Sequence, residues 1–223
     1  MTRSEGALAL DASQLLTLSR WLSPAFPTGA FAWSHGLEAA VGAGEVRDAS
    51  SLQDWLDALL RWGSGRSDAI LLGSSHRAGD EAEVEALAEL ASALAPSRER
   101  RAEAHALGAA FAGAVRAADR LAVPDAPLPV ALGQAARLAG LPALPVALVH
   151  LQATAATLVG AAQRLMPLGQ TAAQGVLAAL ALVAREVAEE AVALGPEDLG
   201  SSALCIDLAS MRHEDQEPRL FRS

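Results

Sequence analysis

Apolar residues recur every three or four positions along most of the chain, which is the spacing of one face of an α-helix. The clearest stripe extends from Leu52 to Leu59, and Ser51 with Asp54 matches a capping box that would open this helix. Asp80 and Ser97 stand where they can cap two further helices. Besides the helix that opens at Ser51, the pattern predicts helices over 11–22, 34–43, 67–76, 80–95, 97–118, 145–166, 170–194 and 202–213.

Proline and glycine separate these segments. Residues 23–29 contain Pro24, Pro27 and Gly29 and predict a loop, and three prolines within 123–129 predict a connection. The chain on either side of that connection is too small and too rich in alanine to bury a core of its own. We therefore expect one domain over residues 1–223, with 1–10 and 214–223 as flexible or partner-ordered ends.

Composition favours an all-helical fold. Alanine and leucine contribute 52 and 36 residues, whereas valine and isoleucine together contribute 15. Alanine and leucine have high helix propensities, and β-branched residues are those favoured in sheets. The sequence predicts an all-α, single-domain bundle of about eight to ten helices. The segment 145–166 is apolar nearly all round, so we expect it at the bundle centre or in a subunit interface.

Several classes of function are excluded by the residue types present. Lysine and tyrosine are absent, so all 17 basic residues are arginines. Without a P-loop lysine, nucleotide hydrolysis by this chain alone is not expected. The net charge of −9 opposes nucleic-acid binding. The one concentrated basic run, Arg98 to Arg101, is interleaved with Glu99 and Glu103, which indicates a solvated helix face.

The sequence predicts a soluble, cytoplasmic protein without a membrane partner. The first residues carry acids and no apolar signal core, and the longest uncharged apolar run, 176–184, is much shorter than the ~20 residues that a membrane span needs. Cys205 is the sole cysteine, so no internal disulfide is expected. Its apolar neighbours on a helix predict a buried, inert thiol.

Metal-binding and catalytic motifs are weak. None of the five histidines follows a glutamate at the spacing of a di-iron bundle. His35 and Glu38 lie one helical turn apart and could share a cation, although a surface or cap pair is the simpler interpretation. The tail residues His213, Glu214, Asp215 and Glu217 could hold a divalent ion weakly, although a flexible acidic tail is favoured. His150 on an apolar helix suits a core histidine. We expect no enzyme; a helical metal carrier or enzyme that uses His35 and Glu38 is the alternative.

Two segments carry more large side chains than a loop or a solubilising tail needs. Six of the eight aromatic residues fall within 21–62. In the first loop, Phe31 and Trp33 either fill the core or present a rigid contact surface, and both interpretations stay open. In the tail, Leu220 and Phe221 lie between two arginines, which is typical of a segment that orders on a partner. Packing against the chain's own domain is the alternative.

Three ordered blocks resemble the urease accessory protein F (UreF) family. The first, Ser-Pro-x-x-Pro-x-Gly-x-Phe-x-x-Ser-x-Gly-Leu-Glu, occupies residues 23–38. The second, Arg-Leu-x-Pro-Leu-Gly-Gln-Thr-x-x-Gln, occupies 164–174, and the third comprises 207–214 with 219–223. Together the blocks are specific and span the chain. Three positions depart from the tyrosine, asparagine and glycine common in the family: Trp33, Thr157 and Ala173.

This resemblance implies an all-α, non-catalytic scaffold and regulator in the maturation of nickel urease. It implies a homodimer that binds UreD (also called UreH), recruits the GTPase UreG and with them delivers nickel to the urease apoprotein. Nickel and GTP would be handled by the complex, with no cofactor bound directly by this chain. Direct activation of UreG by Arg164 or Arg212, as an arginine finger, is a further hypothesis.

The resemblance also implies roles for individual residues. The set expected to bind UreD is Met211, Arg212, His213, Glu214, Leu220, Phe221 and Arg222. The set expected to face UreG or urease, or to line the nickel route, is Phe31, Trp33, Ser34, Glu38, Arg164 and Gln170.

Overall fold

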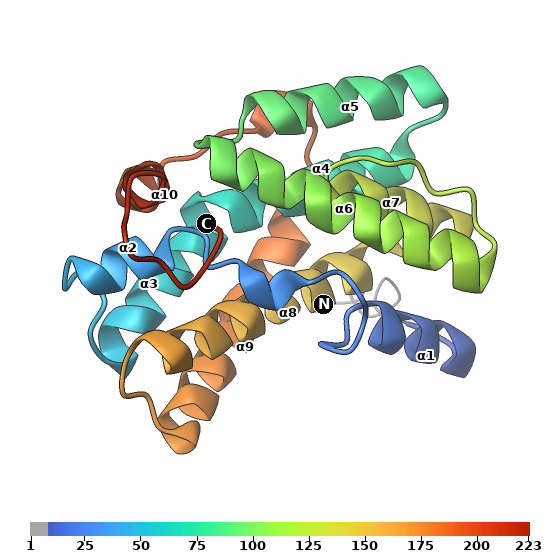
Figure 1. Cartoon of the computed structure of the whole chain (residues 1–223). Helices are drawn as coiled ribbons and strands as arrows, with labels where there is room; N and C mark the ends of the chain where they lie inside the picture. Colours follow the sequence, from blue (N-terminus) through green and yellow to red (C-terminus); the bar gives the residue numbers. More distant parts are fainter. Residues whose placement is uncertain (1–8) are drawn as a thin grey trace.

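Ten α-helices and two short 3-10 turns make up the computed structural model, which describes residues 9–223 (Figure 1). The helices are α1 (Ala12–Trp21), α2 (Leu37–Gly42), α3 (Ala49–Trp62), α4 (Ser64–Arg77), α5 (Glu81–Ala93), α6 (Arg98–Asp119), α7 (Leu128–Leu138), α8 (Ala143–Leu165), α9 (Gln170–Ala191) and α10 (Leu204–His213), and the turns are η2 (Ala30–Ala32) and η3 (Pro196–Asp198). These described residues contain no strand, so the predicted all-α bundle is confirmed. Most of the expected flexible end 1–10 lies outside them.

Side-chain caps define several helix starts. The structure confirms the predicted N-caps Asp80 and Ser97, and Asp11 caps α1 in the same way. The predicted capping box at 51–54 is wrong, because α3 begins one turn earlier. Asp48 is its N-cap, and the Asp48 carboxylate accepts the backbone N–H of Ser51 at 2.9 Å. The apolar stripe from Leu52 still faces the core.

Helix α7 has no counterpart in the sequence prediction, which placed a connection over 123–129. Pro129 is accommodated because the first positions of a helix need no backbone N–H. Gly133 lets the backbone of α7 pass close to α4, since an added Cβ would lie 2.4 Å from the carbonyl oxygen of Leu72. Nearly every residue of α7 up to Ala136 is buried, and the sequence prediction misses its start because it assigns the prolines at 127 and 129 to the connection.

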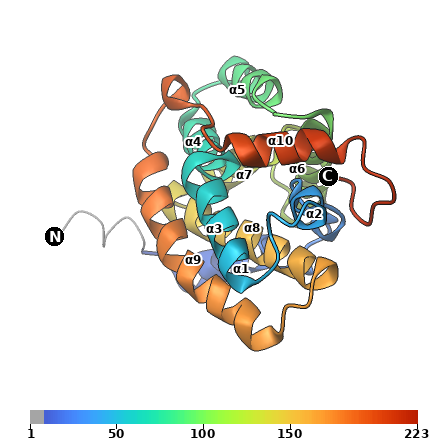
Figure 2. The ribbon, with the colours of Figure 1, turned by 90° about the vertical axis from the view of Figure 1, so that its left-hand side faces the viewer.

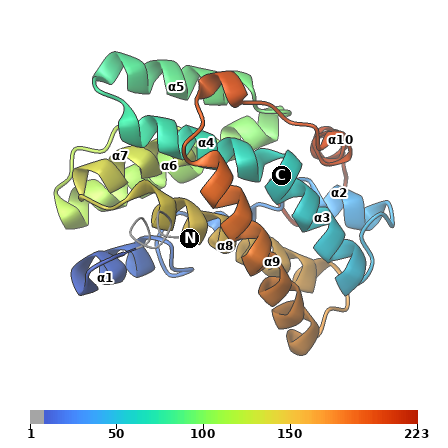
Figure 3. The same cartoon turned by 180° about the vertical axis from the view of Figure 1, so that it is seen from behind.

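The main core surrounds α8. This helix packs against α9, α4, α7 and α2, and Figure 3 shows α9 lying across it. The expected position of the apolar segment 145–166 at the bundle centre is confirmed, since residues such as Val146, Leu151 and Leu158 are almost fully buried. A smaller apolar cluster joins α5 to α4 and α7 at one edge.

Helices α8 and α9 are long and apolar enough to cross a membrane by length and composition alone. In this structure they pack against each other and against α3 and α4, as the core helices of a bundle do. The lack of a membrane partner therefore stays a prediction from the sequence.

Helix α10 lies at the edge of the molecule beside α2 and α6 (Figure 2). Ser210 faces inward and is buried, whereas Leu204, Leu208 and Met211 are between 45 and 65% exposed. Cys205 is also exposed, so the prediction of a buried thiol is wrong. The helix therefore keeps an outer apolar face that the described part of the chain does not cover.

Candidate functional site

Residues from all three sequence blocks meet at one end of the molecule. The loop 23–38 leads into α2, the segment 219–223 returns beside it after α10, and Arg164 reaches both from the end of α8 (Figures 1 and 2). We call the surface that holds residues 219–223 the tail groove. It is formed by residues 31–38, the first two turns of α6 and Arg164.

Glu38 binds the main chain of the tail. One carboxylate oxygen accepts the amide of Leu220 at 2.7 Å, and the other accepts the amide of Phe221 at 2.8 Å. Burial alone would raise the pKa of Glu38, but these two donors and His213 bring this pKa below its usual range. Since Glu38 is only 7% exposed, its charge is stabilised by these donors in place of water.

His213 lies between two carboxylates and is fully buried. Its Nε2 is 3.1 Å from Glu38, and its Nδ1 is 2.6 Å from Glu99. Glu99 also pairs with Arg219, the first residue of the tail segment. These contacts link α2, α10 and α6, and they fix the point at which the chain turns back into the groove.

Phe221 is the apolar anchor of the tail, with 3% of its surface exposed. The guanidinium carbon of Arg164 lies 4.0 Å from the centre of the Phe221 ring, and Arg164 donates to the carbonyl oxygen of Phe31 at 2.9 Å. The guanidinium carbon of Arg222 lies 5.6 Å from the ring centre of Trp33. One cation–π contact therefore joins the tail to Arg164 at the end of α8, and the other joins the tail to the loop.

Backbone contacts complete the groove. The amide of Arg222 donates to the carbonyl oxygen of Ala32, and the amide of Ser34 donates to the carbonyl oxygen of Ser223, both at 2.9 Å. The Ser223 hydroxyl donates to Glu103 at 2.7 Å. Four consecutive tail residues, 220–223, are thus held by at least one main-chain hydrogen bond each.

Glu103 belongs to a buried cluster of ion pairs. It pairs with Arg100, and the Nε2 of His35 lies 2.6 Å from its carboxylate. The prediction of a solvated face is wrong for these residues, because the side chains of Arg100 and Glu103 are only 12% and 2% exposed. Burial would raise the pKa of Glu103, but Arg100, His35 and the Ser223 hydroxyl lower it to about 2.

The stability of the chain should fall with acid because of this cluster. A carboxylate with a folded-state pKa near 2, against a usual 4.5, stabilises the fold above about pH 4.5 and loses that contribution as the pH falls toward 2. Burial and Arg100 also lower the pKa of His35, so its protonation acts in the same direction. We expect a loss on the order of 3 kcal/mol over this range, measured by urea denaturation at several pH values. The Glu103→Gln variant should show a shallower slope; an equal slope would contradict the role of Glu103.

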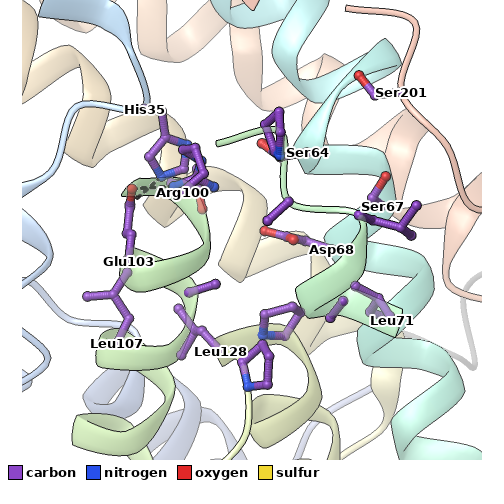
Figure 4. Close-up of a pocket in the computed structure, with 18 of the residues that line it drawn as sticks. His35, Ser64, Ser67, Asp68, Leu71, Arg100, Glu103, Leu107, Leu128 and Ser201 are labelled. Carbon is purple, nitrogen blue, oxygen red and sulfur yellow. Dashed lines mark ion pairs between the residues drawn. The ribbon is translucent and has the colours of Figure 1, made fainter. Parts of the chain in front are cut away.

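The same cluster forms one wall of a cavity of about 130 Å³ (Figure 4). His35, Arg100 and Glu103 line one side, and Asp68 lines the other. His150, buried as predicted, also lines it and lies 3.4 Å from Asp68. Within residues 9–223 no group of three or more His, Cys, Asp or Glu side chains is placed to hold a metal ion.

The structure does not bring His35 and Glu38 together as a pair. His35 points to Glu103 on α6, whereas Glu38 is bound by the tail amides and His213. The shared-cation arrangement that the one-turn spacing suggested is therefore not formed, because each side chain has its own buried partners.

The residues expected to bind UreD fall into two groups. The exposed members are Met211, Arg212, Leu220 and Arg222, and the buried or mostly buried members are His213, Glu214 and Phe221. Glu214 accepts the backbone N–H of Arg98 at 2.6 Å at the start of α6. The tail 214–223 was expected to be flexible or ordered by a partner, but residues 219–223 pack against their own chain.

The residues expected to face UreG or urease, or to line the nickel route, also divide into exposed and buried members. Phe31, Arg164 and Gln170 are exposed, and Trp33, Ser34 and Glu38 are buried. The two aromatic residues of the loop were expected either to fill the core or to present a contact surface, and each does one of these. Trp33 fills the interior, and Phe31 is 74% exposed. Sequence reasoning missed Glu99 and Glu103 as groove residues. Glu99 and Glu103 are four positions apart and therefore lie on one face of α6. This spacing is the one sequence feature that could have predicted that they act at the same site.

The fold and the groove define an all-helical protein in which a polar groove holds the end of its own chain. The family model for UreF matches residues 46–181, which is more than half of the chain. The chain belongs to the UreF family of urease accessory proteins.

Full-length relatives agree with this assignment. A urease accessory protein UreF from Cereibacter sphaeroides is 54% identical over 209 residues, covering 94% of this chain and 98% of the relative. The protein of the same name from Roseobacter denitrificans is 44% identical over 223 residues and covers both chains completely. A third, from Bradyrhizobium diazoefficiens, is 44% identical over 227 residues.

Proposed function

We propose that this chain is a non-catalytic scaffold and regulator of urease maturation, which acts as a homodimer in a cytoplasmic complex with UreD (UreH) and UreG. The complex would couple GTP hydrolysis by UreG to nickel insertion into the urease apoprotein. The observation that carries the proposal is the tail groove, where residues from all three blocks that resemble the family meet. The names of the relatives support the accessory role.

The outer face of α10 and the adjoining tail form the surface that we assign to UreD. Leu208, Met211 and Leu220 are 45, 46 and 59% exposed. Exposed apolar residues with arginines beside them are typical of protein interfaces. In this proposal the buried residues His213 and Phe221 position the surface. His213 anchors α10 to Glu38 and Glu99, and Phe221 anchors the tail under Arg164.

The loop around Phe31 forms the surface that we assign to UreG or urease. Phe31 projects into solvent, and Arg164 holds its carbonyl oxygen while stacking on Phe221. The position of this loop therefore depends on the docked tail. Both arginines suggested as a finger already have partners. Arg164 donates to the Phe31 carbonyl, and Arg212 donates to Glu45 at 2.9 Å. The geometry accordingly favours docking over direct catalysis by Arg164 or Arg212.

Co-purification tests this assignment. We expect tagged full-length chain to capture UreD and, with UreD, UreG. The exposed double substitution Leu208→Asp with Met211→Asp should reduce UreD capture by at least about tenfold, because charges would enter the apolar contact. Leu182→Asp is the matched control, since Leu182 is an exposed leucine of α9.

Two results would count against the proposal. Equal UreD capture by the double variant and the wild type would remove the outer face of α10 from the interface. If the folded wild-type chain captured neither UreD nor UreG, the proposed complex itself would be wrong.

A further inference from the structure

Residues 219–223 contact the rest of the chain in the manner of a bound peptide. We propose that the tail groove is an exchangeable peptide site, which binds residues 219–223 of a second copy of this chain when its own segment is not seated. The proposal concerns recognition of the segment itself, and it holds whether or not UreD and UreG are the partners of the outer surface.

The groove recognises the main chain of an extended segment. The Glu38 carboxylate accepts two successive amides, those of Leu220 and Phe221. The Ala32 carbonyl accepts the amide of Arg222, and the Ser34 amide donates to the carbonyl of Ser223. Main-chain hydrogen bonds of this kind give affinity for an added extended segment, as in sites that bind peptides alongside a backbone edge.

Side-chain contacts give the groove its selectivity. Phe221 is buried beneath Arg164, and Arg219 pairs with Glu99. Ser223 donates to the buried carboxylate of Glu103. The side chain of Leu220 is largely exposed, so the recognised pattern is Arg-x-Phe-Arg-Ser with an unconstrained second position. This chain contains that sequence, which makes a second copy the natural donor.

The connection to α10 is short and weakly held. Asp215 and Gln216 make turn hydrogen bonds to Arg212 and His213, and Glu217 and Pro218 are exposed. Four residues span at most about 14 Å, so exchange requires the α10 ends of two copies to face each other. A tethered segment acts at an effective concentration of about millimolar, and each chain's own tail therefore dominates in the wild type.

Two full-length variants separate the donor function from the acceptor function. The donor, Glu38→Gln with Arg164→Ala, keeps its tail but has a disabled groove. The acceptor, Phe221→Asp, keeps its groove but cannot seat its own tail. Since neither variant can seat its own tail in its own groove, no tethered segment competes. With different affinity tags and at tens of micromolar, we expect the mixture to form a one-to-one heterodimer. Capture between differently tagged copies of one variant measures association through the proposed homodimer, and capture in the donor–acceptor mixture should exceed that level by about tenfold.

The matched control is a donor that also carries Phe221→Asp, for which capture should return to the level of the single variants. Circular dichroism and thermal melting establish that each variant is folded. A synthetic Arg-Leu-Phe-Arg-Ser peptide should bind the folded acceptor and compete with the donor. Absence of both heterodimer and peptide binding would overturn the proposal, and so would capture above the single-variant level when neither partner carries Phe221.

Discussion

Glu38→Gln will release the tail segment and lower the free energy of unfolding by about 3 kcal/mol. The amide has nearly the shape of the carboxylate but only one acceptor oxygen. Its NH₂ group would therefore face the N–H of Leu220 or Phe221, and His213 would lose one of its two carboxylate partners. Hydrogen bonds to charged groups contribute about 1.5–3 kcal/mol each, so the loss is large. Urea denaturation followed by circular dichroism measures it.

Glu45→Gln is the matched control for this prediction. Glu45 also accepts hydrogen bonds from a residue of α10, Arg212, but both side chains are more than one-third exposed. Exposed ion pairs contribute only about 0–1 kcal/mol, so this variant should be nearly as stable as the wild type. A similarly small change in Glu38→Gln would show that the buried carboxylate does not hold the tail.

Gly108→Ala will destabilise the chain by about 4 kcal/mol or more, or prevent folding. A Cβ at this position would lie 1.8 Å from the carbonyl oxygen of Ala126 and 2.8 Å from the amide nitrogen of Leu128. Both neighbours are backbone atoms, so relief would require α6 to move away from the start of α7. Thermal melting should show a fall of about 10 °C or more.

Gly113→Ala in the same helix should have the opposite effect. The nearest atom to its added Cβ is the end of the Arg116 side chain at 3.9 Å, so the methyl group has room. Alanine is favoured over glycine within a helix by about 0.5–1 kcal/mol, and a small gain is expected. Destabilisation of the same size by both substitutions would contradict the close packing at Gly108.

The sequence predicts best the helices whose ends are not obscured by proline. The amphipathic stripe of α3 is visible in the spacing of its leucines, whereas the prolines at 127 and 129 concealed the start of α7. Burial of charge is a separate limit. Arg100 and Glu103 resemble any exposed helical ion pair in sequence, because only the tertiary fold shows that the tail and His35 cover them.

The candidate site is predictable only in part for a similar reason. Apolar residues between arginines indicated that the tail docks on a surface, but not which surface. Glu38 and Phe221 are 183 positions apart, and no local pattern links them. Their meeting depends on the path of α10, which returns the chain to the loop. Within that loop, burial separates Trp33 from the exposed Phe31, although the two are neighbouring aromatics in sequence.

Amide hydrogen exchange, measured on the chain alone and with UreD, tests the account most directly. The groove predicts that the amides of Leu220 and Phe221 exchange slowly in the isolated chain, since both are bound by Glu38. Addition of UreD should slow exchange further across 204–223, where α10 and the tail present their outer face. Unprotected tail amides in the isolated chain would contradict the groove. Protection by UreD only at sites outside 204–223 would contradict the assigned interface.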